Sequence, residues 1–233
     1  MALTSQTQHI VDQTIESRRS IRAYLPTPVA RQDIEQILAV ASRAPSGTNT
    51  QPWNAYVLTG QPLKAMTQEI VSAFLTPPED QTYEEEYAYY PSQWTSPYKE
   101  RRRKVGFDLY GLLGLTKDNR AGMQIQHARN FKFFDAPVGI IFSLDRVFRV
   151  GSWLDFGCFL QNVMLAARAR GLDTCPQAAF NKYHSIIREH TGMPEQEVMM
   201  CGMALGYADP KAIENTLVTE RNPVANFTTF IDQ

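Results

Sequence analysis

Three arginines and a serine lie within five residues near the N-terminus: Arg18, Arg19, Ser20 and Arg22. The planar guanidinium group of arginine can donate two parallel hydrogen bonds to a phosphate group, and a serine hydroxyl can donate a third. This arginine stretch could therefore hold the phosphate of a molecule whose reactive part lies elsewhere. Short arginine-rich stretches are also common as solvated turns, so the cluster by itself leaves both interpretations open.

A second polar stretch, at residues 44–54, has the sequence APSGTNTQPWN. Its prolines, glycine and short polar side chains predict a loop whose exposed backbone N–H groups would suit close approach to a flat ring. The alternative is an ordinary connection between a helix and a strand. Apolar spacing predicts helices at residues 7–17 and 31–43, and alternation predicts a strand at residues 53–59. These elements would present the two polar stretches at their ends.

Together, Arg18-Arg19-Ser20-Ile21-Arg22 and Pro45-Ser46-Gly47-Thr48-Asn49-Thr50-Gln51-Pro52-Trp53 resemble two motifs of the nitroreductase family of flavin enzymes. Further similar segments reach almost to the C-terminus, and departures are confined mainly to about residues 75–130. Part of that region, from Tyr89 to Tyr110, is similar to the branch that reduces nitrobenzoates. The resemblance implies an α+β fold with a central mixed sheet of four or five strands flanked by helices. It also implies an entwined homodimer that exchanges C-terminal arms.

The rest of the chain is expected to complete one domain over residues 1–233. Apolar patterns predict helices at residues 62–75, about 101–115, 151–170 and 182–190, and buried strands at 138–142 and 198–207. The helix at 151–170 is apolar on most sides, which predicts burial, and its counterpart in the family lies across a subunit interface. The tail at 209–233 has no helical period and is too long for a loose end, which fits the exchanged arm.

An excursion at about residues 76–130 follows the predicted helix at 62–75 and begins with prolines. Aromatic residues are concentrated in its first part. Two interpretations stay open for them: a lid that stacks on a planar substrate, or a small core that packs the excursion onto the domain. The cations at 101–104 are expected on a solvated surface, with steering of anionic substrates as the alternative. The aromatic residues in question are Tyr83, Tyr87, Tyr89, Tyr90, Trp94 and Tyr98.

Composition narrows the class of protein. The 233 residues are 43% hydrophobic and 20% charged, which is ordinary for a soluble globular protein. A net charge of −1 gives no indication of a nucleic acid or membrane partner. Neither a signal peptide nor an apolar run of about 20 residues is present in the sequence. Three widely spaced cysteines and four scattered histidines form no disulfide framework and no metal-ligand pattern, so a cytoplasmic protein without a metal is expected.

The resemblance also assigns the site. It implies FMN, and the chain has no Gly-x-Gly-x-x-Gly segment of the kind that holds a dinucleotide. Arg18, Arg19, Ser20 and Arg22 would hold the phosphate and ribityl chain, helped by Arg221. The other subunit would contribute Pro45, Ser46, Gly47 and Asn49. The flavin ring would be bordered by Pro176, Gln177, Ala178 and Ala179, and the substrate would face Trp94, Tyr98 and Phe134.

The implied reaction needs no catalytic side chain, because the flavin carries the chemistry. NAD(P)H would deliver a hydride, leave, and be replaced by a nitroaromatic compound or a quinone, in ping-pong two-electron transfer that takes nitro groups to hydroxylamines. The same scaffold also serves flavin reductases and reductive dehalogenases. An FMN-binding or storage protein without turnover is the alternative from a different functional class.

Overall fold

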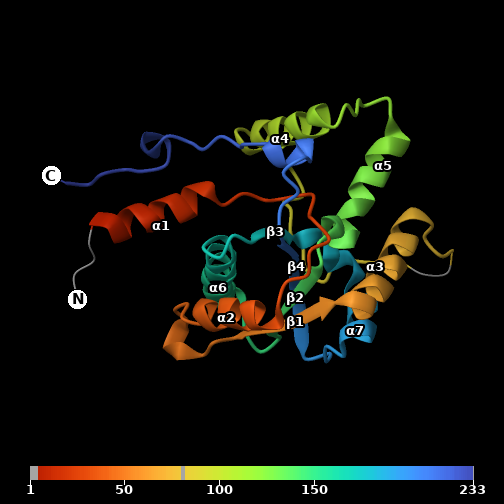
Figure 1. Cartoon of the computed structure of the whole chain (residues 1–233), viewed down its shortest axis with the longest axis horizontal. Helices are drawn as coiled ribbons and strands as arrows, with labels where there is room; N and C mark the ends of the chain where they lie inside the picture. The colour runs from red at the N-terminus through yellow and green to blue at the C-terminus, as the bar shows by residue number, and fades with distance from the viewer. Residues whose placement is uncertain (1–4, 80–81, 233) are drawn as a thin grey trace.

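The computed structural model describes residues 5–79 and 82–232, and these are built around a four-stranded sheet of order β1-β2-β4-β3 (Figure 1). The strands are β1 (Trp53–Thr59), β2 (Val138–Asp145), β3 (Asp173–Gln177) and β4 (Glu197–Gly206). All three strand pairs are antiparallel, so the expected mixed sheet is wrong for these strands. The parallel pairing is an isolated bridge between Ser20 and Thr174 at the β3 edge.

The position of each strand in the sheet follows from its side chains. The central strands β2 and β4 are buried along almost their whole length, as their continuous apolar runs predict. Strand β1 lies at an edge of the sheet, pairs with β2, and buries one of its residues, Leu58. The predicted strands at 53–59, 138–142 and 198–207 are therefore confirmed, with β2 extended to Asp145.

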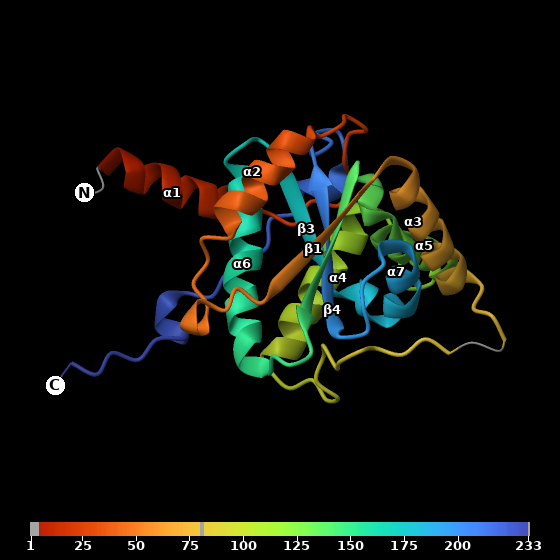
Figure 2. The same cartoon turned by 90° about the horizontal axis from the view of Figure 1, so that it is seen from below.

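Helices cover both faces of the sheet and create two cores (Figure 2). On one face, α2 (Arg31–Ala41) and α6 (Val150–Arg168) pack through Ile37, Phe159 and Val163. On the other face, α3 (Gly60–Leu75) and α7 (His184–Thr191) pack with the 3₁₀ turns η2 (Arg129–Asp135) and η3 (Ala178–Tyr183). Both faces of the sheet are thus covered.

The remaining elements lie outside these layers. Helix α1 (Ser5–Ser17) buries none of its residues, and it projects from the body on the same side as the C-terminal tail (Figures 1 and 2). The excursion contains α4 (Tyr98–Leu112) and a helix that the sequence did not indicate, α5 (Arg120–Ala128). The tail contains only short 3₁₀ turns, η4 (Ile213–Thr216) and η5 (Val224–Asn226). Within the described residues, no helix is long and apolar enough to cross a bilayer.

Helix α6 corrects one expectation. Its apolar circumference predicted burial on most sides, but Leu154 is 75% exposed and Val150 is exposed as well. One side of the helix packs on α2 and the sheet, and none of the residues at 5–79 and 82–232 covers Val150 and Leu154 on the other side. The apolar surface that remains is typical of a helix with a further partner.

Candidate functional site

The arginine stretch runs as an extended segment along the β3 edge of the sheet. The Ile21 N–H donates to the Thr174 carbonyl at 3.1 Å, directly after the bridge at Ser20. Ile21 is buried, whereas the side chains of Ser20 and Arg22 on either side of it are only partly covered. This is the alternation of a strand, and it aims the polar side chains away from the core.

The Arg18 and Arg221 guanidinium groups lie within electrostatic range of each other beside this segment. Partial burial, followed by the nearby positive charge of Arg221, lowers the pKa of Arg18. Neither group forms an ion pair with a carboxylate anywhere in residues 5–79 and 82–232. Arg221 instead donates to Thr219 and to the Glu220 carbonyl, in its own segment. Two converging cations that lack an acidic partner make a site suited to an anion such as phosphate.

The nearest potential anions in the protein do not neutralise this pair. Burial raises the pKa of Cys175 to about 11, although Arg22, Ser20 and Arg18 oppose the shift. The thiol is therefore neutral near pH 7. The Asp173 carboxylate already pairs with Arg168 at 3.1 Å. A bound anion such as phosphate would supply a counter-charge for Arg18 and Arg221.

The end of β3 lies at the same edge. Pro176 is partly exposed and Gln177 is buried, with its Nε2 atom donating to the Asn130 carbonyl at 2.6 Å. Ala178 and Ala179 follow in η3 and stay partly accessible. Their small side chains leave the backbone of this turn open to close approach. The structure thus brings residues 176–179 to the edge along which the arginine stretch runs.

The loop at 45–49 lies elsewhere in the protomer. The Gly47 N–H donates to Asp155 Oδ2 at 3.2 Å, near the start of α6, whereas Arg168 at its end donates to Ser17 Oγ at 3.0 Å. At 1.5 Å per residue, these two points are about 20 Å apart along the helix. Thr48, Asn49 and Gln51 have positive φ angles of 49°, 60° and 49°, so the backbone of this loop turns sharply. Within one protomer it does not join the arginines.

The three predicted substrate residues have different environments. Phe134 is only 1% exposed and belongs to the core, so it has no surface to offer a substrate in this protomer. Tyr98 is exposed at the start of α4, and Trp94 is partly exposed. The Arg102 guanidinium lies over Trp94 at 5.0 Å and over Tyr90 at 5.8 Å. This cluster is the accessible aromatic surface of the excursion.

The core interpretation is confirmed for one part of the excursion, and the lid stays a prediction for the other. Tyr83 and Tyr87 pack against the two cores, whereas Tyr89, Tyr90 and Tyr98 stay exposed. Between the two parts, Asn181 accepts from the Glu86 N–H at 3.0 Å and donates to the Tyr87 carbonyl at 2.7 Å. Asn181 belongs to the same turn as Ala178 and Ala179, so the excursion is tied to the end of β3.

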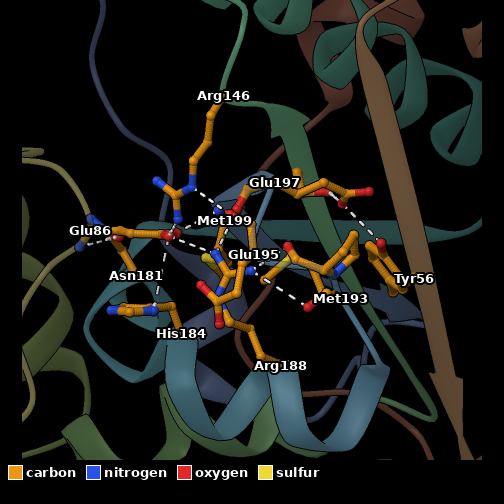
Figure 3. A network of polar contacts seen from close by, with 12 residues as sticks. Tyr56, Glu86, Arg146, Asn181, His184, Arg188, Met193, Glu195, Glu197 and Met199 are labelled. Atoms are coloured by element: carbon orange, nitrogen blue, oxygen red, sulfur yellow. Dashed lines mark hydrogen bonds and ion pairs between the residues drawn. The ribbon is translucent and has the colours of Figure 1, made fainter.

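A buried ionic network fixes this tie (Figure 3). The Glu86 side chain is 6% exposed and accepts from Arg188 Nη2 at 2.6 Å and from the Met199 N–H at 2.6 Å. Arg146 also pairs with it. Arg188 donates in addition to the carbonyls of Pro194 and Glu197. Sequence patterns did not indicate this network, because its members are far apart along the chain.

The chain is similar to known proteins over most of its length. A sequence model described as the nitroreductase family matches residues 15–207. The chain belongs to this family. A 4-nitrobenzoate reductase of Pseudomonas putida is 42% identical over 220 residues, covering 94% of this chain and 95% of the relative. A chloronitrobenzene nitroreductase of Comamonas testosteroni is 38% identical, covering 97% and 99%.

A solved structure agrees with the sequence relatives. It is that of an FMN- and NADPH-dependent nitroreductase, NfnB, from Sphigopyxis sp. strain HMH, with a TM-score of 0.90 and 33% identity over 96% of this chain and 99% of that one. The expected nitroreductase-like α+β fold is confirmed. No group of His, Cys, Asp or Glu side chains within the described part of the chain could hold a metal ion.

A separate cavity lies away from the arginine stretch. It has a volume of about 1400 Å³ and runs along the unpaired edge of β1, with α2 and α3 as its walls. Its lining includes Val57, Thr59, Leu63 and Val71. Because β1 and β3 are at opposite edges of the sheet, this groove is not part of the cation site. An open strand edge beside a groove that has apolar side chains and also charged ones, such as Arg31, Lys64 and Asp135, is suited to an extended peptide segment.

Proposed function

We propose that this protein is an FMN-dependent oxidoreductase that uses NAD(P)H to reduce nitroaromatic compounds. The observation that carries the proposal is that the arginine stretch, with Arg18 within electrostatic range of Arg221 and without an acidic partner, runs along β3 beside the turn at 176–179 in a nitroreductase fold. Relatives that span almost the whole chain are named for nitrobenzoate and chloronitrobenzene reduction. Quinones are a second proposed class of acceptor, because they too are planar and accept two electrons.

The residues fit FMN in charge and in shape. Arg18, Arg22 and Arg221 would bind the phosphate, with Arg19 and Ser20 extending the site, and the turn with Ala178 and Ala179 would lie against the ring. FMN, when bound, would supply the redox chemistry, which is two-electron transfer from NAD(P)H to the acceptor. The protein positions the two reactants in turn and places fixed positive charge near the cofactor.

We further propose that the enzyme is a homodimer in which each site combines two protomers. The loop with Pro45, Ser46, Gly47 and Asn49 lies about 20 Å along α6 from the arginine stretch, so it would serve the partner's cofactor. Apolar residues on α1 and α6 that are exposed in the protomer support an interface there; they are Ile10, Val11, Ile15, Val150 and Leu154. Obligate interfaces of this kind usually bury more than about 2,000 Å².

The tail is proposed as the exchanged arm. Phe227, Phe230 and Ile231 are exposed, with Ile231 at 91%, although residues of this kind are usually buried. The groove along β1 offers the partner's arm an open strand edge and the apolar side chains of Val57, Leu63 and Val71. Docking there would cover both the apolar residues of the tail and the groove.

We also propose that the enzyme works in the cytoplasm, where NAD(P)H is available and its three cysteines stay reduced.

The test of the function is product analysis combined with oxygen-electrode traces. We expect the purified protein to bind FMN and to reduce 4-nitrobenzoate to the hydroxylamine with two NAD(P)H per nitro group, releasing one water. The rate should be nearly the same in air and under nitrogen, because electrons move in pairs. Nitro-dependent oxygen uptake that spares the nitro compound would show one-electron transfer. FMN binding without NAD(P)H turnover would instead indicate a storage protein.

Acceptor choice should depend on Trp94. Replacing it with alanine removes the ring beneath Arg102, and an aromatic contact is worth about 0.5–1.5 kcal/mol. We therefore expect the ratio of kcat/KM between two-ring and one-ring nitroaromatics to change by about two- to tenfold, with FMN affinity within twofold of wild type. Trp94→Phe, which keeps a ring, should lie near wild type. A uniform loss for all acceptors that follows a loss of FMN would contradict the assignment.

A further inference from the structure

Asn215 connects the start of the C-terminal tail to the arginine stretch. The Arg22 N–H donates to Asn215 Oδ1 at 2.8 Å, and Asn215 Nδ2 donates to the Ala23 carbonyl at 2.8 Å and to the Asp209 carbonyl at 3.1 Å. One amide side chain thus satisfies the backbone groups of two successive residues, as a neighbouring strand would do. The two contacting residues are 193 positions apart in the chain.

The surroundings of Asn215 hold it in place. The neighbouring Glu214 is buried and pairs with Arg129 at 2.5 Å. The Asp209 N–H donates to the Ala23 carbonyl at 3.0 Å, and Tyr24 forms a bridge with Ala208. The arginine stretch and the first part of the tail therefore form one hydrogen-bonded unit, with Asn215 at its centre.

This unit carries both halves of the cation site. Arg18 and Arg22 lie on one segment, and the tail leads from Asn215 to Arg221. The positive charge of Arg221 acts unfavourably on Arg18, and hydrogen bonds elsewhere hold the two segments side by side. Two hydrogen bonds of Asn215, with Arg22 and Ala23, join the two segments directly, and the third, to the Asp209 carbonyl, lies within the tail.

We propose that Asn215 is a positioning residue for phosphate binding, which holds the two cation-bearing segments together so that their guanidinium groups converge on one anion. The inference rests on the proposed function, in which that anion is the phosphate of FMN. Asn215 need not touch the cofactor. Its effect should therefore be specific to the phosphate and leave binding of the flavin ring largely intact.

The experiment compares FMN with riboflavin, which has the same ring system and no phosphate. Affinities are measured by quenching of flavin fluorescence with wild type, Asn215→Ala, Arg18→Ala and Asn119→Ala. Asn119 is the matched control. Its side chain also accepts a hydrogen bond from a backbone N–H, that of Gly122, but it lies at the start of α5, outside the hydrogen-bonded unit of Asn215. We expect Asn215→Ala to weaken FMN binding about ten- to a hundredfold, as Arg18→Ala should, and riboflavin binding by less than twofold. Asn119→Ala should bind both flavins like wild type.

The outcomes separate this inference from the proposed function. If wild type binds FMN no more tightly than riboflavin, the phosphate site itself is wrong. If wild type prefers FMN and Asn215→Ala keeps the same preference, or loses both flavins equally, the positioning role is wrong.

A second measurement does not depend on the variant folding. In wild type, FMN should slow amide hydrogen exchange in both 20–25 and 209–216, and riboflavin should do so in neither. Equal exchange with the two flavins over 209–216 would also overturn the inference.

Discussion

Replacing Glu86 with alanine should destabilise the protein by about 3–5 kcal/mol, the usual cost of breaking a buried ion pair on one side. The change leaves the Arg188 guanidinium, which extends from α7 and is buried beside β4, without the Glu86 carboxylate, and leaves the Met199 N–H without its acceptor. Urea unfolding followed by circular dichroism at a fixed protein concentration measures the loss, since dimer formation would make stability depend on concentration.

Two variants control this prediction. Glu84→Ala changes an exposed carboxylate in the same segment and should stay within about 0.5 kcal/mol of wild type. Adding Arg188→Met to Glu86→Ala removes the unpaired charge, so the double variant should be more stable than the sum of the single changes predicts. A Glu86→Ala protein within 1 kcal/mol of wild type would show that the network in Figure 3 contributes little to stability.

Making the tail polar should have an effect of similar size on assembly. The triple variant Phe227→Ser, Phe230→Ser and Ile231→Ser removes three exposed apolar side chains, each worth about 1.5–3 kcal/mol when fully buried. We expect the dissociation constant of the dimer to rise by at least about a thousandfold, even if burial in the groove is partial. Sedimentation equilibrium across a wide range of concentrations provides the measurement.

The matched control is Val147→Ser, which changes another exposed apolar residue, in the turn between β2 and α6. It should leave the association unchanged. A triple variant that stays dimeric at nanomolar concentration would mean that the tail is not the element that holds the subunits together. Loss of FMN from a variant that remains a dimer would instead assign the tail to the cofactor site alone.

The elements themselves were largely predictable, because hydrophobic periodicity is a local property of the chain. The strand at Trp53–Thr59 and the helices α1, α2, α3 and α6 are at their expected places within a few residues. The arginine stretch also had the chemistry of an anion site before its surroundings were known. The family motifs extended this to the roles of residues 45–49, 176–179 and Arg221, which stay proposals until they are tested.

Only the tertiary structure decided which of these groups meet. Phe134 lies beside a strand and gave no local sign that its side chain is buried in the core. Asn215 stands in a polar tail without any period, yet its amide completes the backbone pairing of Arg22, 193 positions earlier. Glu86 and Arg188 are likewise distant in sequence and form one buried pair. Such contacts are decided by long-range packing. The periodicity of apolar residues indicates only the face that a helix or strand will bury. A polar side chain gives no local indication of the distant residue that it will contact.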